Sequence, residues 1–353
     1  MPACKKLAGP WRITFDTNPY LCNLRCIFCE VHSIYNKNRP KSSEAIMDPE
    51  IIRRVISSAA PYGLREVIPS TMGEPLLYPY FDVFIEMAKK YNIKINLTTN
   101  GTFPIRGVEE WGYLILPVAS DVKISINGAT KRTAESIMVG LDFEKQLRNI
   151  ERFIEIRDEI RKEGINNPTV TFQVVYMESN LEELPELLKM AIDMGADRFK
   201  GHHLWITWPQ LKGESLRRNI DARRRWNSIV DKLYKIRDSY RGPNGKKIKL
   251  ANVYKLPLEM KNSLIPDDWV CPFAGREAWI AWDGTFNVCC APDNLRKTFG
   301  YFGNVKETDF MELWNSEKYN RFAENWGGYS VCKLCNMRRP RKDIKGCEDG
   351  VID

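Results

Sequence analysis

The regular alternation of short apolar segments with helical patterns constrains the fold of this chain more than any other feature. Segments rich in β-branched and aromatic residues are separated by amphipathic stretches from residue 11 to about residue 200. The predicted strands are residues 12–17, 66–70, 94–99, 121–126, 169–176 and 196–201. The predicted helices between them are residues 48–60, 80–91, 143–164 and 180–195. Because a closed barrel of this kind takes eight units, six units predict an α/β fold with a partial (β/α)6 TIM-like barrel.

The pattern changes after about residue 202. A basic helical stretch (214–240) leads into a turn-rich segment (241–247), and cysteine, tryptophan and glycine dominate from there to residue 335. We therefore expect the barrel to span residues 1–240, a linker to span 241–265 and a small C-terminal domain to span 266–353.

The composition is that of a globular chain without a membrane span. Hydrophobic residues make up 43% and charged residues 28%, and no apolar run approaches the roughly 20 residues that a membrane helix needs. The N-terminus has no apolar stretch of signal-peptide length, so we expect a cytoplasmic protein. Thiols stay reduced there, so the ten cysteines are expected to be metal ligands rather than disulfides.

The net charge of +8 is partly concentrated in two runs, 217–225 and 338–342. Such runs usually form solvated faces, and the alternative is attraction of an anionic substrate. A nucleic-acid partner is not expected, because aromatic residues are not interleaved with the basic ones.

The first cysteine cluster follows the first predicted strand. Cys22, Cys26 and Cys29 fall on the loop after that strand, where β/α barrels carry their chemistry. Three thiolates at this spacing can hold three irons of a [4Fe–4S] cluster and leave the fourth iron open. The alternative is a structural zinc site with His32 as its fourth ligand.

This cluster, CxxxCxxC with an aromatic residue before the last cysteine, resembles the hallmark of the radical S-adenosylmethionine (radical SAM) superfamily. Three further motifs follow the second, third and fourth strands as in that family: MGEP (72–75), TTNG (98–101) and SING (125–128). The resemblance implies that these loops bind S-adenosylmethionine. The implied cofactor-binding residues are Phe28, Gly73, Glu74, Pro75, Thr98, Asn100, Ser125 and Asn127. The alternatives are a surface carboxylate at Glu74 and ordinary turns at the other loops.

The resemblance also implies the chemistry of the open iron. The amino and carboxylate groups of S-adenosylmethionine chelate it, and reductive cleavage yields a 5′-deoxyadenosyl radical that abstracts hydrogen from a substrate carbon. An external one-electron reductant of the flavodoxin or ferredoxin type is the implied partner.

A second cysteine set lies in the C-terminal part. A CxxC pair joined by two distant cysteines completes a four-thiolate site. Its members are Cys271, Cys289, Cys332 and Cys335. The spacing resembles the twitch version of the SPASM extension of radical SAM enzymes, which implies one auxiliary [4Fe–4S] cluster. A zinc site is the alternative, and the cluster could accept an electron or only order the domain.

Three cysteines remain. Cys290 is a candidate hydrogen donor to a substrate radical, a small buried hydrophobe, or the cluster ligand in place of Cys289. Cys4 and Cys347 are expected to be inert.

The last predicted strand runs into two histidines and two tryptophans. His202 and His203 are candidate catalytic residues, as a base or a hydrogen-bond donor, and one of them is expected to be structural. Trp205 and Trp208 could contact a substrate or pack in the core.

Three functions compete. The first is epimerisation or dehydrogenation of a small polyol, such as a sugar, aminocyclitol or nucleoside-type natural-product intermediate. The second is maturation of a ribosomally made peptide by epimerisation or crosslinking, and the third is a non-catalytic iron–sulfur electron carrier or zinc module. Many peptide maturases carry a recognition domain before the first cluster, whereas here that cluster begins at residue 22, so the polyol is expected.

Overall fold

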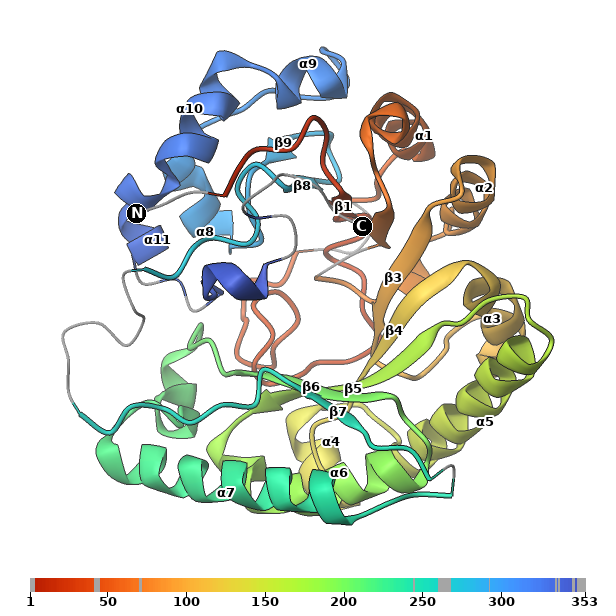
Figure 1. Ribbon diagram of the computed structural model, residues 1–353, viewed down its shortest axis with the longest axis vertical. Helices are drawn as coiled ribbons and strands as arrows, with labels where there is room; N and C mark the ends of the chain where they lie inside the picture. Colours follow the sequence, from red (N-terminus) through yellow and green to blue (C-terminus); the bar gives the residue numbers. More distant parts are fainter. Residues whose placement is uncertain are drawn as a thin grey trace.

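The computed structural model contains one nine-stranded sheet that curls around a central lumen (Figure 1). It describes residues 4–40, 45–69, 72–243, 245–259, 268–291, 293–333, 335, 337–344 and 347. The strand order is β7-β6-β5-β4-β3-β2-β1-β8-β9. The strands are β1 (Arg12–Phe15), β2 (Glu66–Pro69), β3 (Lys94–Thr99), β4 (Ala119–Ser125), β5 (Thr169–Tyr176), β6 (Arg198–His203), β7 (Lys249–Ala251), β8 (Glu277–Ile280) and β9 (Phe286–Asn287).

The six predicted strands are β1 to β6, which pair in parallel with their neighbours as the expected α/β barrel requires. Ser70, the last residue of the second predicted strand, lies outside the described residues. Two further strands extend the sheet from unexpected places. β7 lies within the segment expected to be a linker, of which residues 244 and 260–265 are not described, and it pairs with β6. β8 comes from the segment expected to form the small domain, and it pairs in parallel with β1.

Seven helices of the barrel cover the outer face of the sheet in the part of the chain that the structure describes (Figure 1). They are α1 (Pro49–Ala59), α2 (Asp82–Tyr91), α3 (Gly107–Ile115), α4 (Lys131–Ile137), α5 (Phe143–Lys162), α6 (Leu184–Asp193) and α7 (Ile220–Ser239). α1 begins as the sequence indicates, because the Asp48 side chain accepts a hydrogen bond from the Glu50 amide. α3 and α4 were not expected. None of the helices in the described ranges is long and apolar enough to cross a membrane.

Strand alternation separates an apolar outer face from a polar lumen. On β4, Val122 and Ile124 are fully buried in the hydrophobic core beneath the helices. Asp121, Lys123 and Ser125 alternate with them and therefore face the lumen. The lumen is thus lined by groups that can bind a polar ligand.

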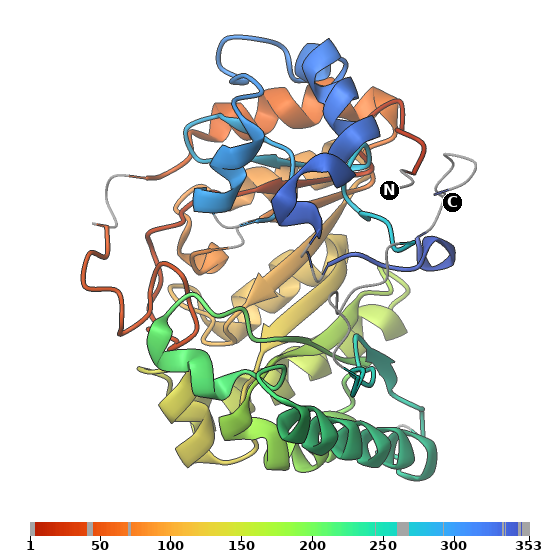
Figure 2. The ribbon, with the colours of Figure 1, turned by 90° about the vertical axis from the view of Figure 1, so that its left-hand side faces the viewer.

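The C-terminal part packs beside β1 on the barrel (Figure 2). β8 and β9 form an antiparallel hairpin, and an aromatic cluster with ring centroids 5.2–6.5 Å apart packs around Phe286. Its helices are α8 (Asp293–Arg296), α9 (Phe310–Trp314), α10 (Glu317–Asn325) and α11 (Ser330–Lys333).

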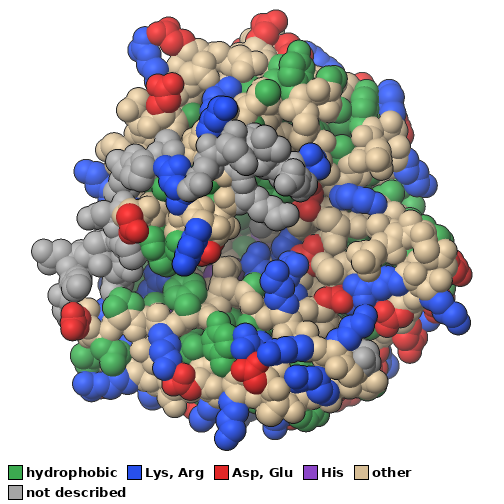
Figure 3. Space-filling model, viewed as in Figure 1, with side chains coloured by type: hydrophobic (Ala, Val, Ile, Leu, Met, Phe, Trp, Pro, Cys, Tyr) green, Lys and Arg blue, Asp and Glu red, His purple; other side chains and the backbone are tan. Residues whose placement is uncertain are grey.

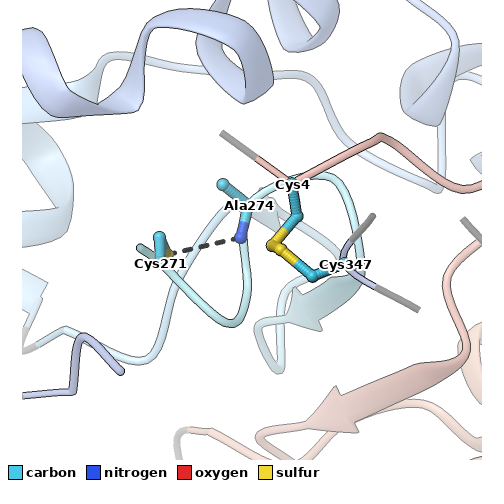
Figure 4. The surroundings of a disulfide bond; sticks show 4 residues. All are labelled: Cys4, Cys271, Ala274 and Cys347. Atoms are coloured by element: carbon cyan, nitrogen blue, oxygen red, sulfur yellow. Dashed lines mark hydrogen bonds between the residues drawn. A yellow bond between two sulfur atoms is a disulfide. The ribbon is translucent and has the colours of Figure 1, made fainter. Parts of the chain in front are cut away.

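A disulfide joins Cys4 to Cys347, 343 residues apart (Figure 4). The expectations that these two cysteines are inert and that disulfides are absent were therefore wrong. The sequence could not show that the two chain ends meet: the Lys5 amide donates to the Cys347 carbonyl, and the Leu7 amide donates to the Gly275 carbonyl. Both contacts lie beside the loop that carries Cys271.

Candidate functional site

The loop that carries the first three cysteines is fastened to the loop after β2. The Asn18 side-chain amide donates to the Glu74 carbonyl at 2.8 Å, and the Glu74 amide donates to the Leu21 carbonyl at 2.9 Å. A Cβ at Gly73 would lie 2.1 Å from the Asn18 carbonyl oxygen. Glycine is required at residue 73 because the two loops touch there.

The Glu74 side chain joins these loops to the end of β3. Its buried carboxylate accepts hydrogen bonds from the Thr99 hydroxyl at 2.7 Å, the Asn100 amide at 2.8 Å and the Leu76 amide at 3.2 Å. Burial raises the pKa of Glu74 to about 7, and the three hydrogen bonds oppose that rise. The carboxylate therefore sets the shape of the MGEP loop from within the protein, and Pro75 begins the short turn that follows.

The next two motifs lie at the same edge of the sheet. The Asn100 side chain donates to the side chain of Asn23 at 2.8 Å, in the cysteine loop. The Asn127 side chain is buried and accepts from the Val175 amide at 2.8 Å. Thr98 and Ser125 are only partly buried. The structure thus brings all the predicted cofactor-binding residues to one end of the barrel, where Asn100 and Asn127 hold the loops.

Gln146 and Trp208 also shape this end, and the sequence analysis missed both roles. The Gln146 amide on α5 donates to the Asn100 carbonyl at 2.7 Å and to the Ser125 carbonyl at 2.9 Å. The Trp208 indole donates to the Cys29 carbonyl at 2.9 Å. Neither residue belongs to a recognisable pattern, so only the fold shows that they position the cofactor loops.

The three cysteines fit an iron–sulfur cluster better than a zinc ion. The Leu24 amide donates to the Cys22 sulfur at 3.5 Å and the His32 amide donates to the Cys29 sulfur at 3.2 Å, which is typical of cluster thiolates. Three thiolates can bind three irons of a [4Fe–4S] cluster, whereas a structural zinc site needs a fourth protein ligand.

His32 is the fourth ligand that a zinc site would need, and one of its two ring nitrogens is already engaged. Its Nε2 atom is 2.8 Å from the Pro19 carbonyl oxygen. Burial lowers the pKa of His32 to about 4, so the ring is neutral. Its contact with Pro19 joins the two ends of the segment that carries the three cysteines.

The four cysteines of the second set gather around one cavity. Cys271 lies before β8 and Cys289 after β9, so the hairpin brings them together, and Cys332 and Cys335 come from α11 and the turn after it. The Ala274 amide donates to the Cys271 sulfur at 3.4 Å (Figure 4), and the Ala291 amide donates to the Cys289 sulfur at 3.2 Å.

Cys290 lines the same cavity as these four cysteines. Its thiol donates a hydrogen bond to Cys289, which lowers the pKa of Cys289 and raises that of Cys290.

The cavity has a volume of about 350 Å³ and extends from the second cysteine set to residues of the loops around the first set. Phe28, Glu30 and Met72 come from the loops of the first site, and His202 and Trp205 come from the end of β6 and the loop after it. The remaining wall is mostly apolar: Phe273, Leu295, Phe322, Trp326, Val331 and Met337. The polar side chains on the wall are fewer: Glu30, His202, His203, Thr207 and Arg338. Any group in the cavity therefore meets mainly aromatic, aliphatic and sulfur surfaces.

The two histidines have different environments. The His203 ring is buried, with its centroid 4.7 Å from that of Trp226 and 5.7 Å from that of Tyr176. The His202 side chain is exposed to the cavity. The surrounding protein still removes most of its water, and this desolvation, with a smaller effect of the Lys200 charge, lowers the pKa of His202 to about 4. Both rings line the cavity, and the more exposed His202 ring is the better placed to contact a bound substrate.

Comparisons with known proteins identify the class. A model of the radical SAM superfamily matches residues 19–191, and a model of an iron–sulfur cluster-binding domain, SPASM, matches residues 271–336. The chain belongs to the radical SAM superfamily and, within it, to the enzymes that carry a SPASM domain. These matches support S-adenosylmethionine and [4Fe–4S] clusters, including an auxiliary cluster, as its cofactors.

Two relatives align along nearly the whole chain. The tungsten-containing aldehyde ferredoxin oxidoreductase cofactor-modifying protein of Pyrococcus furiosus is 26% identical over 335 residues, covering 90% of this chain and 85% of that protein. The PqqA peptide cyclase of Gluconobacter oxydans is 22% identical over 336 residues, covering 92% and 82%.

Solved structures share the fold. Streptococcus suis SuiB bound to its precursor peptide SuiA has a TM-score of 0.65 at 17% identity, covering 94% of this chain and 72% of that chain. The enzyme anSMEcpe with bound AdoMet has a TM-score of 0.63 at 17% identity, covering 97% and 91%.

Proposed function

We propose that this radical SAM enzyme modifies a ribosomally made peptide, by forming a crosslink or by epimerising one residue. The sequence analysis preferred a small polyol and kept the peptide as its alternative. The comparisons favour the alternative, because a peptide cyclase aligns along nearly the whole chain. One solved structure of the same fold holds a precursor peptide.

The composition of the cavity wall is the observation that carries the proposal. A polyol has a hydroxyl on most of its carbons, and each buried hydroxyl needs a hydrogen-bond partner. Beside the cysteines, however, the wall consists mainly of large apolar side chains, including Phe273, Phe322 and Trp326. Such a wall suits the side chain of a peptide residue.

The residues of this chain would divide the work as follows. Cys22, Cys26 and Cys29 would hold the first cluster, and the loops after β2, β3 and β4 would hold S-adenosylmethionine. When bound, these cofactors supply a 5′-deoxyadenosyl radical that takes hydrogen from a substrate carbon. The second cysteine set would hold the auxiliary cluster, and the apolar wall would exclude water from the reacting group.

Cys290 distinguishes the two outcomes. In epimerisation, a hydrogen atom would leave a substrate carbon in 5′-deoxyadenosine and another would return to the opposite face from Cys290, the candidate donor on the cavity wall. The Cys290 thiyl radical would then take one electron from the external reductant and one proton. In crosslinking, one hydrogen atom would leave in 5′-deoxyadenosine and the other as a proton, with its electron passing to an acceptor, for which the auxiliary cluster is the candidate, and no hydrogen returns. Cys290→Ala should therefore abolish epimerisation and leave crosslinking intact.

The test uses reduced enzyme with both clusters, an external one-electron reductant, S-adenosylmethionine and short peptides encoded beside the gene, in deuterated water. Release of 5′-deoxyadenosine with a modified peptide supports the proposal: a crosslinked product lacks two hydrogen atoms, and an epimerised product gains one deuterium. A set of polyols is tested in parallel. Turnover of a polyol without turnover of any peptide would contradict the proposal, and no 5′-deoxyadenosine at all would leave a non-catalytic iron–sulfur carrier.

A further inference from the structure

The barrel lumen contains more positive than negative charge. At the end of the lumen where the strands begin, Arg12 pairs with Glu66 at 3.0 Å and with Glu277 at 2.7 Å. Both carboxylates line a cavity of about 540 Å³ at this end, together with Arg339. In Figure 3, Lys and Arg side chains gather around the hollow in the middle of the molecule.

The third carboxylate of the lumen is also fully engaged. Asp121 accepts hydrogen bonds from the Thr169 and Thr171 hydroxyls, each at 2.7 Å, and it pairs with Arg198 at 3.2 Å. Lys123 lies 3.9 Å from the same carboxylate and donates to the side chain of Asn96. None of the three carboxylates is left to neutralise another cation.

Lys200 faces this lumen, and the carboxylate whose charge acts on it, Asp121, is already bound to other residues. On β6 it shares a face with His202, which lines the cavity between the cysteine sites, whereas Phe199 and Gly201 point outward into the core. Lys200 is partly buried and forms no hydrogen bond or ion pair with any residue that the structure describes. It is paired in register with Gln173 on β5.

Lys200 and Gln173 belong to a row of lumen-facing residues that continues onto β4, because Gln173 is paired in register with Ser125. Neither of these side chains is hydrogen-bonded to a described residue. Ser125, Gln173 and Lys200 thus present a hydroxyl, an amide and an ammonium group side by side on three neighbouring strands. Adjacent strands are about 4.8 Å apart, so the row spans about 10 Å.

Charge balance indicates what such a row would bind. With Lys123 protonated, the cations Arg12, Lys123, Arg198 and Lys200 exceed the carboxylates Glu66, Asp121 and Glu277 by one charge, four against three. The other charged residues on the wall of the 540 Å³ cavity add to this excess, because four of them are cations and one is a carboxylate: Arg65, Lys94, Arg276, Arg339 and Asp343. A partly buried ammonium that shares its only counter-charge with other cations is unfavourable. Accordingly, burial lowers the pKa of Lys200, the Asp121 charge opposes this, and the charges of Arg12, Arg198 and Arg339 lower the pKa further. An anionic ligand would remove this cost.

We infer that Lys200 binds a carboxylate of the substrate, namely an Asp or Glu side chain close to the peptide residue that is modified. Gln173 would donate a second hydrogen bond to the same group, and His202 would contact the neighbouring residue. The inference rests on the proposed function. The carboxylate of S-adenosylmethionine has the same chemistry, and the experiment separates the two sources.

The binding experiment uses immobilised enzyme that contains both clusters and S-adenosylmethionine. The probe is a pool of capped octapeptides in which single positions carry Glu, Gln or Lys. Wild-type enzyme should enrich Glu over Gln about tenfold at one position, as expected for a hydrogen bond to a charged group. Lys200→Gln should remove this preference, Lys200→Arg should keep it, and Lys200→Glu should enrich Lys instead.

Lys249→Gln is the matched control, because it removes the same charge from an exposed position on β7, and it should leave the preference unchanged. Equal loss in both variants would mean that only net charge attracts the peptides and would overturn the inference. An unchanged preference in Lys200→Gln would overturn it as well.

Equilibrium dialysis with S-adenosylmethionine is the second arm. We expect its affinity to differ by less than about twofold between wild type and Lys200→Gln. A tenfold loss there, with peptide selectivity intact, would assign the lysine to the cofactor and contradict the inference. Binding of glutarate, measured by tryptophan fluorescence, should also fall about tenfold in Lys200→Gln. That result would hold even if the natural substrate were not a peptide, so failure of the proposed function remains distinguishable.

Discussion

The two cysteine sites are built in opposite ways. The first takes its three ligands from eight consecutive residues, and its shape comes from hydrogen bonds to the loops of neighbouring strands. The second takes four ligands from a span of 65 residues, brought together by a hairpin and a short helix. On the proposed assignment, the local set of three would leave one coordination position for a cofactor, whereas the distant set of four would close around its cluster and hold the hairpin and the short helix of the C-terminal part together. Mutations in the two sites should therefore have different effects on iron content, activity and stability.

Removal of one ligand from each site is the largest expected effect. With two [4Fe–4S] clusters, the chain should hold about eight irons. Cys26→Ala should lower this to about four and abolish 5′-deoxyadenosine release, because no S-adenosylmethionine could be bound at iron. Cys335→Ala should also leave about four irons but should keep the release. Iron and sulfide analysis with chromatography of the nucleoside checks both variants.

Equal loss of release in the two variants would contradict this division between the sites. Four irons in the wild-type protein would remove the auxiliary cluster.

Gly73→Ala tests how tightly the first site depends on loop contacts. The new Cβ would meet the carbonyl oxygens of Asn18 and Leu21 at 2.1 and 2.6 Å. We expect a loss of about 3 kcal/mol in the free energy of unfolding, together with weaker binding of S-adenosylmethionine. Gly213→Ala is the control, since nothing lies within 4 Å of its Cβ position. Denaturant titration of both variants measures the difference, and similar midpoints would show that the loops do not touch.

Removal of the disulfide tests the anchoring of the second site. Cys4→Ser should lower the free energy of unfolding by about 2–4 kcal/mol, because the Cys4–Cys347 bond restricts the unfolded chain. The first cluster should be unaffected. Unfolding is followed with and without reductant, and the gap between wild type and variant should close when reductant is present. A gap that persists there would assign the effect to packing.

The smallest expected effect concerns Lys123, in the lumen between the sites. Burial lowers its pKa from 10.5 to about 7. Between these values the unfolded chain binds one proton more than the folded protein, so this lysine makes stability rise with pH from 7 to 10.5, by about 1 kcal/mol per pH unit. Lys123→Met should lose that slope and keep its iron. Identical pH profiles for the two proteins would show that Lys123 titrates normally.

Much of the fold could be predicted from the sequence, because β1 to β6 have local signals. Each predicted strand overlaps the observed one, and the α1 cap at Asp48 is correct. The pairing of β8 with β1 joins Arg12 to Glu277 across the chain, and no local pattern specifies such a contact. α4 has only seven residues, too few for a clear helical period.

The candidate site was predictable to the same extent. Cys22, Cys26 and Cys29 could be recognised in the sequence because they lie close together in it, and the SPASM match begins at the predicted Cys271. The supporting contacts could not be recognised, because they join distant residues: Trp208 contacts Cys29 across 179 residues. Cys4 and Cys347 illustrate the same limit, since their pairing depends on where the two chain ends meet.

The most direct measurement is the electron paramagnetic resonance spectrum of the reduced Cys332→Ala/Cys335→Ala variant, before and after addition of S-adenosylmethionine. With the auxiliary cluster removed, the remaining signal reports only the cluster of Cys22, Cys26 and Cys29. We predict a shift of its g-values on addition, because the nucleotide binds the iron that lacks a cysteine. A spectrum that does not change would contradict an open coordination position at that iron.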